Sequence, residues 1–135
     1  MITDAIAAKL RTVTGLDVYV NQAPLDSIPC IVIDDNGDSR DKYFSNTGAV
    51  ATGLIDRDYE FTIWADLENG GSRYVAQVAE TITAALDNFT GQLQTATSPN
   101  LTHRVAFIET NDGGADFNEA AQVYGHSVFA VVTYA

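Results

Sequence analysis

The stretch from Asp58 to Phe89 changes its hydrophobic period halfway, and this change constrains the fold more than any other feature of the chain. Its first part, Tyr59 to Asp66, alternates apolar and polar residues with a period of two, as a half-buried strand does. Leu67 to Gly71 breaks the pattern, and Ser72 stands where a helix N-cap is expected. Apolar residues then recur every three or four positions, as in a helix with one buried stripe. They are Val75, Val78, Ala79, Ile82, Leu86 and Phe89. The stretch therefore predicts a strand and an amphipathic helix joined by a tight turn.

A second amphipathic helix is predicted at the N-terminus, because four apolar residues share one helical face: Ile2, Ile6, Leu10 and Val13. Thr3 is expected to cap this helix and Gly15 to end it. Leu16 to Val20 then alternates as a short strand. Cys30 to Ile33 is apolar on both sides, which is typical of an interior strand.

The C-terminal part predicts two further strands. Arg104 to Thr110 alternates, with Val105 and Phe107 expected on one side of the sheet. Asn111 to Gly114 is a strong turn signal. Ala115 to Gln122 is ambiguous and could hold one short helical turn. The chain then closes with a long strand, from 123 to 134.

Two segments are predicted to lie outside these elements. Thr90 to Asn100 is rich in small polar residues and predicts a surface connection. Asp34 to Asp56 is the most polar and least periodic region, and a structureless loop of this length is unusual in a compact domain. Either part of it extends the flanking strands as a protruding hairpin, or it is a mobile loop that orders against a partner. The run of small residues from Ser45 to Gly53 favours the second alternative for that part.

The predicted order is helix, strand, strand, long loop, strand, helix, strand, strand. Because the helices do not alternate strictly with the strands, this order predicts an α+β fold with a mainly antiparallel sheet. The two amphipathic helices are expected to pack on one face of that sheet. A chain of 135 residues is expected to form a single domain, residues 1–135.

The charge of the chain excludes some classes of partner. Eighteen acidic and seven basic residues give a net charge of −11, so a basic groove that wraps nucleic acid is not expected. An anionic membrane surface would also repel the chain. No apolar run approaches the length of a membrane span, and the N-terminus lacks the pattern of a signal peptide. The protein is therefore expected to be made and kept in the cytoplasm.

Few residues suggest chemistry. The acidic run Asp34 to Asp38 resembles a calcium loop, but its glycine and its twelfth position do not fit an EF-hand, so a solvated loop is expected. His103 and His126 are too few to define a metal centre, and each is interpreted as an ordinary strand residue. Cys30 could pair with a histidine as a nucleophile, but its apolar neighbours favour an inert, buried thiol. Gly70 to Ser72 could bind an anion at a helix N-terminus, although nearby carboxylates favour a tight turn with a cap.

The sequence thus predicts no catalytic, metal-binding or cofactor-binding residue, and no enzyme. Three aromatic residues stand out instead as candidates for a protein interface: Tyr43, Phe44 and Trp64. Tyr43 and Phe44 lie in the polar, glycine-rich loop, and such aromatic anchors are common at interfaces. Trp64 lies on the otherwise polar side of the central strand, which suggests that this face of the sheet is not wholly bare.

The order and spacing of these elements resemble the tail terminator, or tail completion, proteins of long-tailed bacteriophages. The matching residues extend over nearly the whole chain: the helix ending near Gly15, Asp17 to Tyr19, Ile28 to Ile33, Tyr59 to Ala65, Tyr74 to Leu86 and His126 to Val132. Cys30 stands where the family more commonly has an aromatic residue. None of these motifs is sharp by itself, so the resemblance rests on their succession.

The resemblance implies a structural role without catalysis. Members of that family form hexameric rings on the head-proximal end of the tail tube, end its growth and present a surface to the connector of the head. It implies a homo-hexamer in the neck region of a virion, assembled in the host cytoplasm. The tail tube protein and a head-completion protein would be its partners, and DNA would pass through the lumen without specific binding. The loop from Asp34 to Asp56 is then the best candidate for contacts with other subunits. The alternatives are a tail tube or neck protein, or a small soluble enzyme.

Overall fold

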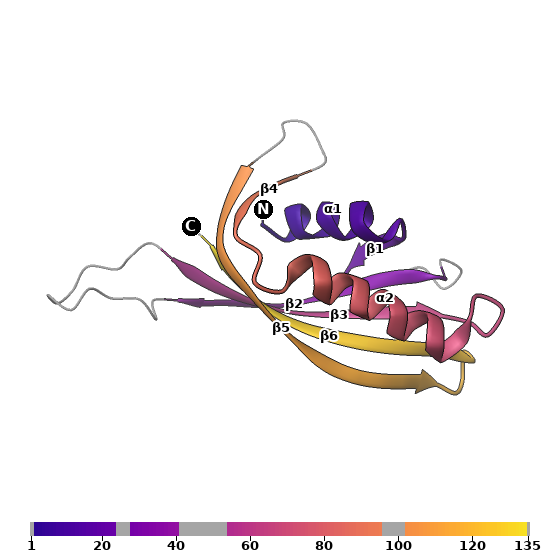
Figure 1. The fold of residues 1–135 in the computed structure, drawn as a ribbon. Helices are drawn as coiled ribbons and strands as arrows, with labels where there is room; N and C mark the ends of the chain where they lie inside the picture. Colours follow the sequence, from indigo (N-terminus) through magenta and orange to yellow (C-terminus); the bar gives the residue numbers. More distant parts are fainter. Residues whose placement is uncertain (1, 24–27, 41–53, 96–101, 135) are drawn as a thin grey trace, which may run out of the picture.

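The computed structural model describes residues 2–23, 28–40, 54–95 and 102–134, which form one twisted sheet with two helices above it (Figure 1). The helices are α1 (Ile2–Thr14) and α2 (Gly71–Leu86). The strands are β1 (Asp17–Val20), β2 (Cys30–Arg40), β3 (Ile55–Ala65), β4 (Gly91–Gln94), β5 (Thr102–Asn118) and β6 (Val123–Tyr134).

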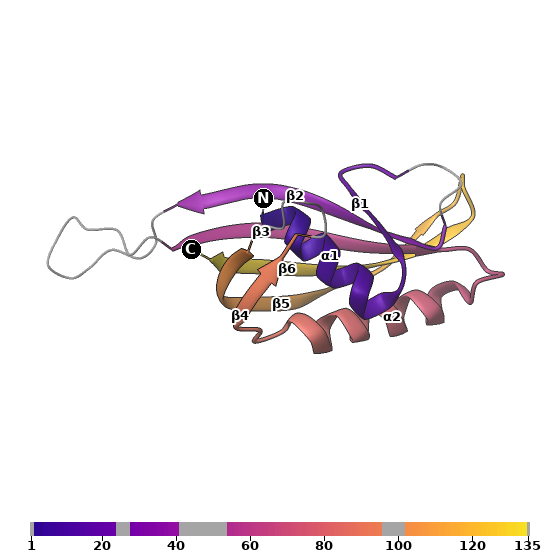
Figure 2. The same cartoon turned by 90° about the horizontal axis from the view of Figure 1, so that it is seen from above.

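The sheet has the strand order β1-β2-β3-β6-β5-β4. Only the pairing of β1 with β2 is parallel, and the other four pairings are antiparallel. Both helices lie on the same side of this sheet (Figures 1 and 2). The predicted α+β class, with a mainly antiparallel sheet and two helices on one face, is therefore confirmed.

The core lies between the helices and the sheet. The helical stripe of α2 is buried at Val75, Ala79, Ile82 and Leu86, and α1 contributes Ile2, Ile6 and Leu10. The alternation of β3 places Tyr59, Phe61, Ile63 and Ala65 beneath them. Burying each large apolar side chain contributes roughly 1.5–3 kcal/mol, so this layer supplies most of the driving force for folding.

Both predicted N-caps are wrong. α2 begins at Gly71, and its N-cap is Gly70, whose φ of 107° lies in the left-handed region that favours glycine. Ser72 therefore lies inside the helix. α1 begins at Ile2, so Thr3 lies in the first turn, where its hydroxyl is buried against the sheet instead of capping the helix.

The predicted turn from Asn111 to Gly114 is also wrong. β5 continues through this segment to Asn118, and the glycines are accommodated by a register shift between Asp112 and Gly114. Such a bulge lets a strand carry an extra residue and bend without ending. The reversal of the chain comes later, in the turn at residues 119–122, so no helical turn lies between 115 and 118.

Two predicted loops contain strand residues. The connection from Thr90 to Asn100 contains β4, which pairs with the start of β5. The predicted loop from Asp34 to Asp56 is shorter than expected at both ends, because β2 continues to Arg40 and β3 already begins at Ile55. The flanking strands are thus extended, as the hairpin alternative predicted. Residues 41–53, which include Ser45 to Gly53, lie outside the described residues.

Neither of the two helices that the structure describes is long and apolar enough to cross a membrane. The described strands belong to one sheet. A single domain over residues 1–135 stays a prediction.

Candidate interaction surface

The face of the sheet that points away from the helices is built from cross-strand rows, which we call the open face. Because paired residues of antiparallel strands project to the same side, the register defines these rows. From the end near the 119–122 turn, they are Asp116, Gly125, Trp64 and Cys30; Gly114, Ser127, Thr62 and Val32; Asn111, Phe129, Glu60 and Asp34; Glu109, Val131 and Asp58; and Phe107, Thr133 and Asp56.

Trp64 lies on this open face, as the sequence indicated. Its indole ring lies against the backbone of Gly125 on β6, because a Cβ atom built on that glycine would be 2.7 Å from Cζ3 of the ring. Trp64 also lines a shallow hollow of about 410 Å³ with Val32 and Asn118. The side chain is partly exposed, and its role in an interface stays a prediction.

Phe129 repeats this arrangement on the neighbouring strand pair. A Cβ atom built on Gly113 of β5 would lie 2.8 Å from Cε2 of the Phe129 ring. Phe129 is nevertheless 42% exposed, and Phe107 in the last row is 43% exposed. Aromatic rings that lie over strand glycines compensate for the missing side chain, so part of this arrangement stabilises the sheet. The exposed remainder is apolar surface open to a partner.

Sequence reasoning missed Phe107 and Phe129. It placed Val105 and Phe107 on one side of the sheet, but a register shift between them puts Val105 in the core and Phe107 on the open face. Phe129 lies in the apolar run Val128 to Val132, which shows no alternation in the sequence, and only the structure shows that its neighbours Val128 and Ala130 are buried. The other two predicted interface residues, Tyr43 and Phe44, lie outside the described residues.

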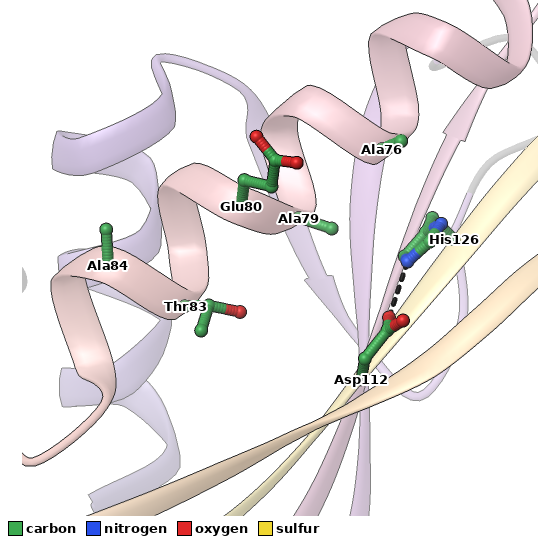
Figure 3. A pocket seen from close by; sticks show the side chains of 7 residues that line it. All are labelled: Ala76, Ala79, Glu80, Thr83, Ala84, Asp112 and His126. Carbon is green, nitrogen blue, oxygen red and sulfur yellow. Dashed lines mark hydrogen bonds and ion pairs between the residues drawn. The ribbon is translucent and has the colours of Figure 1, made fainter.

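A groove lies on the opposite side of the sheet, between α2 and the β5–β6 pair (Figure 3). It has a volume of about 440 Å³, and its walls combine small residues of α2 with Asp112 of β5 and His126 of β6. The imidazole of His126 donates a hydrogen bond from Nε2 to Oδ1 of Asp112 over 2.6 Å. This hydrogen bond is the main cause that lowers the pKa of Asp112, and the backbone N–H of Gly114 adds to it.

The nucleophile pair considered from the sequence does not form. His126 faces the helices, whereas Cys30 pairs with Trp64 and lies on the open face. His103 lies near the other end of β5, opposite Leu93. Among residues 2–23, 28–40, 54–95 and 102–134, no group of three or more metal-ligating side chains comes together.

A polar network ties the start of α1 to the base of the β2–β3 extension. Arg57 donates two hydrogen bonds to the carboxylate of Asp35, from Nε to Oδ1 over 2.9 Å and from Nη2 to Oδ2 over 2.7 Å. The hydroxyl of Thr3 donates to Asp35 over 2.8 Å, so the Tyr59 hydroxyl, also 2.8 Å away, donates to Thr3. The bidentate pair of Arg57 and Asp35 fixes β2 and β3 relative to each other, and the hydrogen bond from Thr3 attaches α1 to the same carboxylate.

The network also changes the acidity of its members. Burial by itself would raise the pKa of Asp35, but hydrogen bonds from Arg57, the N–H of Gly37 and Thr3 outweigh it, so the net pKa is lowered. Burial raises the pKa of the Tyr59 hydroxyl above its ordinary value. Asp35 therefore carries its charge and Tyr59 stays neutral at physiological pH.

Comparison with known proteins shows a likeness of fold. A solved structure described as the virion of a native gene transfer agent (GTA) particle contains a similar chain, with a TM-score of 0.54. The sequences are 15% identical, and the match covers 93% of this chain and 84% of that chain. No protein-family model matches the sequence, and no curated protein matches it either.

Proposed function

We propose that this protein is a structural component of a phage-like virion that caps the head-proximal end of the tail tube. The observation that carries this proposal is the similarity of fold, over nearly the full chain, to a chain of a gene transfer agent virion. The succession of elements that resembles tail terminator proteins adds the specific role. Both observations point to virion assembly, and both rest on the order of the helices and strands along the chain.

The surface suits contact with proteins. The open face is broad, and it exposes Phe107 and Phe129 beside several polar side chains. A small substrate is usually held in an enclosed pocket, whereas partner proteins are bound by extended faces with aromatic anchors. We therefore expect the protein to work by binding and not by catalysis.

In the assembly that we propose, six copies close into a ring on the tube. The ring ends the addition of tube subunits and offers its free side to a head-completion or connector protein. DNA passes through the centre, and a net charge of −11 keeps the ring from gripping the phosphate backbone. The protein then resides in the neck region of the virion after assembly in the host cytoplasm.

A tail tube subunit or a neck protein is the second candidate. The fold favours these as much as a terminator, since the description of the matched particle does not say which component the similar chain is. The three roles differ in their behaviour. A tube subunit polymerises along the tube, a neck protein binds the head, and a terminator binds only the tube end.

The proposal is tested by light scattering of the purified protein, followed by electron microscopy of the protein mixed with tail tubes. A terminator gives one ring at one end of each tube. Continuous incorporation along the tube would show a tube subunit. Tubes with both ends bare would contradict the capping role.

A further inference from the structure

The charged residues in the five rows of the open face are all acidic. Beyond these rows, Arg104 of β5 projects to the same side of the sheet, opposite Gln92 of β4. The carboxylates lie in four of the five rows and come from three strands, β2, β3 and β5: Asp34, Asp56, Asp58, Glu60, Glu109 and Asp116. None of the residues in these rows is a lysine or an arginine. Asp56 and Glu60 accept hydrogen bonds from Thr133 and Ser127, whereas Asp58, Glu109 and Asp116 are exposed.

An apolar strip runs through this acidic field. Phe129 and Phe107 are exposed, and Val131 lies between them on β6 and is half-buried. Val131 is flanked in its own row by Glu109 on one side and Asp58 on the other. The strip therefore follows β6 at Phe129 and Val131 and ends on β5 at Phe107, and carboxylates of β3 and β5 flank it at Val131.

The charge pattern selects the occupant of this surface. A second copy that docked with the same face would bring carboxylates against carboxylates, which costs free energy when water is excluded. Nucleic acid would be repelled by the same charges. A partner that places arginine or lysine side chains over Asp58 and Glu109, and apolar side chains over Val131 and the two phenylalanines, would satisfy both features.

We propose that the open face docks a partner protein through a contact that is cationic at its border and apolar at its centre. The identity of the partner as another virion component rests on the proposed function, whereas the chemistry of the contact does not. Charged borders set the orientation and the rate of association, and the buried aromatic centre supplies most of the affinity.

The chemistry is tested by nuclear magnetic resonance with the full chain and a defined probe, the hexapeptide Ac-Arg-Leu-Arg-Leu-Arg-Leu-NH2. We expect saturable shifts at Phe107, Phe129 and Val131 at peptide concentrations up to about 1 mM, a weak-affinity limit. Peptides with glutamine or glutamate in place of arginine serve as controls and should give no saturable shifts. Equal shifts with the glutamine peptide, shifts centred on the helices, or no saturable shift with the arginine peptide would overturn the proposal.

A pair of variants with matched charge provides the second arm. Asp58→Lys with Glu109→Lys reverses the charge on both sides of the strip. Both residues are exposed, and within the described part of the chain neither carboxylate has a hydrogen bond or ion pair. Glu68→Lys with Glu80→Lys makes the same change of net charge on the helix side, where both residues are exposed. We expect the first pair to weaken peptide binding at least tenfold and the second pair to change it less than twofold. Equal losses in both pairs would overturn the proposal.

Incorporation of the same variants into virions separates this inference from the proposed function. If the peptide binds as expected but the wild-type chain is found in no virion, the surface chemistry stands and the virion role fails. If the wild-type chain enters virions and the open-face pair enters them as well as the helix-side pair does, the docking surface is overturned and the virion role stands.

Discussion

The two faces of β3 and β6 share a backbone but carry different kinds of side chain. On the helix side, Phe61 and Val128 form a pair that is 0% and 1% exposed. In the adjacent row, Glu60 and Phe129 form a pair on the open face, where Phe129 is 42% exposed. Because side chains alternate along a strand, one residue packs in the core while its neighbour faces the open side of the sheet.

This difference separates the residues that specify the fold from those that are free for binding. The helix side is filled by α1 and α2, so each of its apolar residues stabilises the native state. On the open face, the exposed carboxylates Asp58, Glu109 and Asp116 are expected to add little to stability, and Phe129 adds less than a fully buried ring does. The acidic open face with its apolar strip is therefore available for contact with a partner.

The largest expected effect compares two phenylalanines that lie one row apart. Phe61→Ala leaves a cavity between the sheet and the helices and should lower the free energy of unfolding by about 3–5 kcal/mol. Phe129→Ala removes a ring that is already in contact with water and should cost less than about 1.5 kcal/mol. Urea unfolding of both variants measures the difference. Equal losses would show that the open face also belongs to the core.

The second effect concerns the network at the base of the β2–β3 extension. Asp35→Asn leaves Arg57 with a neutral partner, and we expect a loss of about 1–3 kcal/mol at pH 7. Because the pKa of Asp35 is lowered in the folded state, its contribution is present above the ordinary value of 3.8 and is lost as the pH falls through the folded value. Unfolding curves between pH 7 and pH 2 should therefore converge for the two proteins at low pH. A difference that does not shrink would contradict this role for the carboxylate.

A third, smaller effect tests the contact between Trp64 and Gly125. Gly125→Ala would place its Cβ atom 2.7 Å from the indole, so the ring must move, at a cost of about 1–2 kcal/mol. Trp64 is the only tryptophan, and its fluorescence should shift to longer wavelength as the ring enters water. Gly113→Ala is the control, because its Cβ atom meets Phe129 and Ser127 but not Trp64. An unchanged spectrum in the first variant would contradict the observed packing.

The smallest effect concerns His103, whose Nε2 atom is buried and has no hydrogen-bond partner among the described residues. Burial lowers the pKa of His103 in the folded state below the ordinary value of 6.5. The unfolded chain then takes up a proton more readily, so stability should fall as the pH drops below 6.5 towards the folded value. The variant His103→Gln should remove this part of the pH dependence. A slope between pH 7 and pH 5 that is the same in both proteins would show that His103 does not cause it.

Hydrophobic periodicity predicted the elements that form the core. The alternation from Tyr59 to Asp66 and the stripe from Val75 to Leu86 were sufficient because burial on one face leaves a strong pattern. The two helices, the central strand and their common face followed from these patterns. The start of each helix did not, since the first turn of α1 uses Thr3 in a tertiary network and α2 uses a glycine cap.

The candidate site was harder to predict because it depends on register. The glycines at 113 and 114 signal a turn when they are considered alone, yet a bulge accommodates them once β6 pairs alongside. The same kind of register shift turned Phe107 out of the core. Trp64 was found because an indole on a polar strand face is unusual, whereas Phe129 lay within an apolar run that hid its orientation.

Tail length tests most directly whether the protein ends the growth of a tail tube. Electron microscopy of particles assembled without the protein should show tubes of variable, excessive length that are not joined to heads, and adding back the wild-type gene should restore uniform tails. Tails of normal length in its absence would contradict the capping role, as would the loss of all tubes.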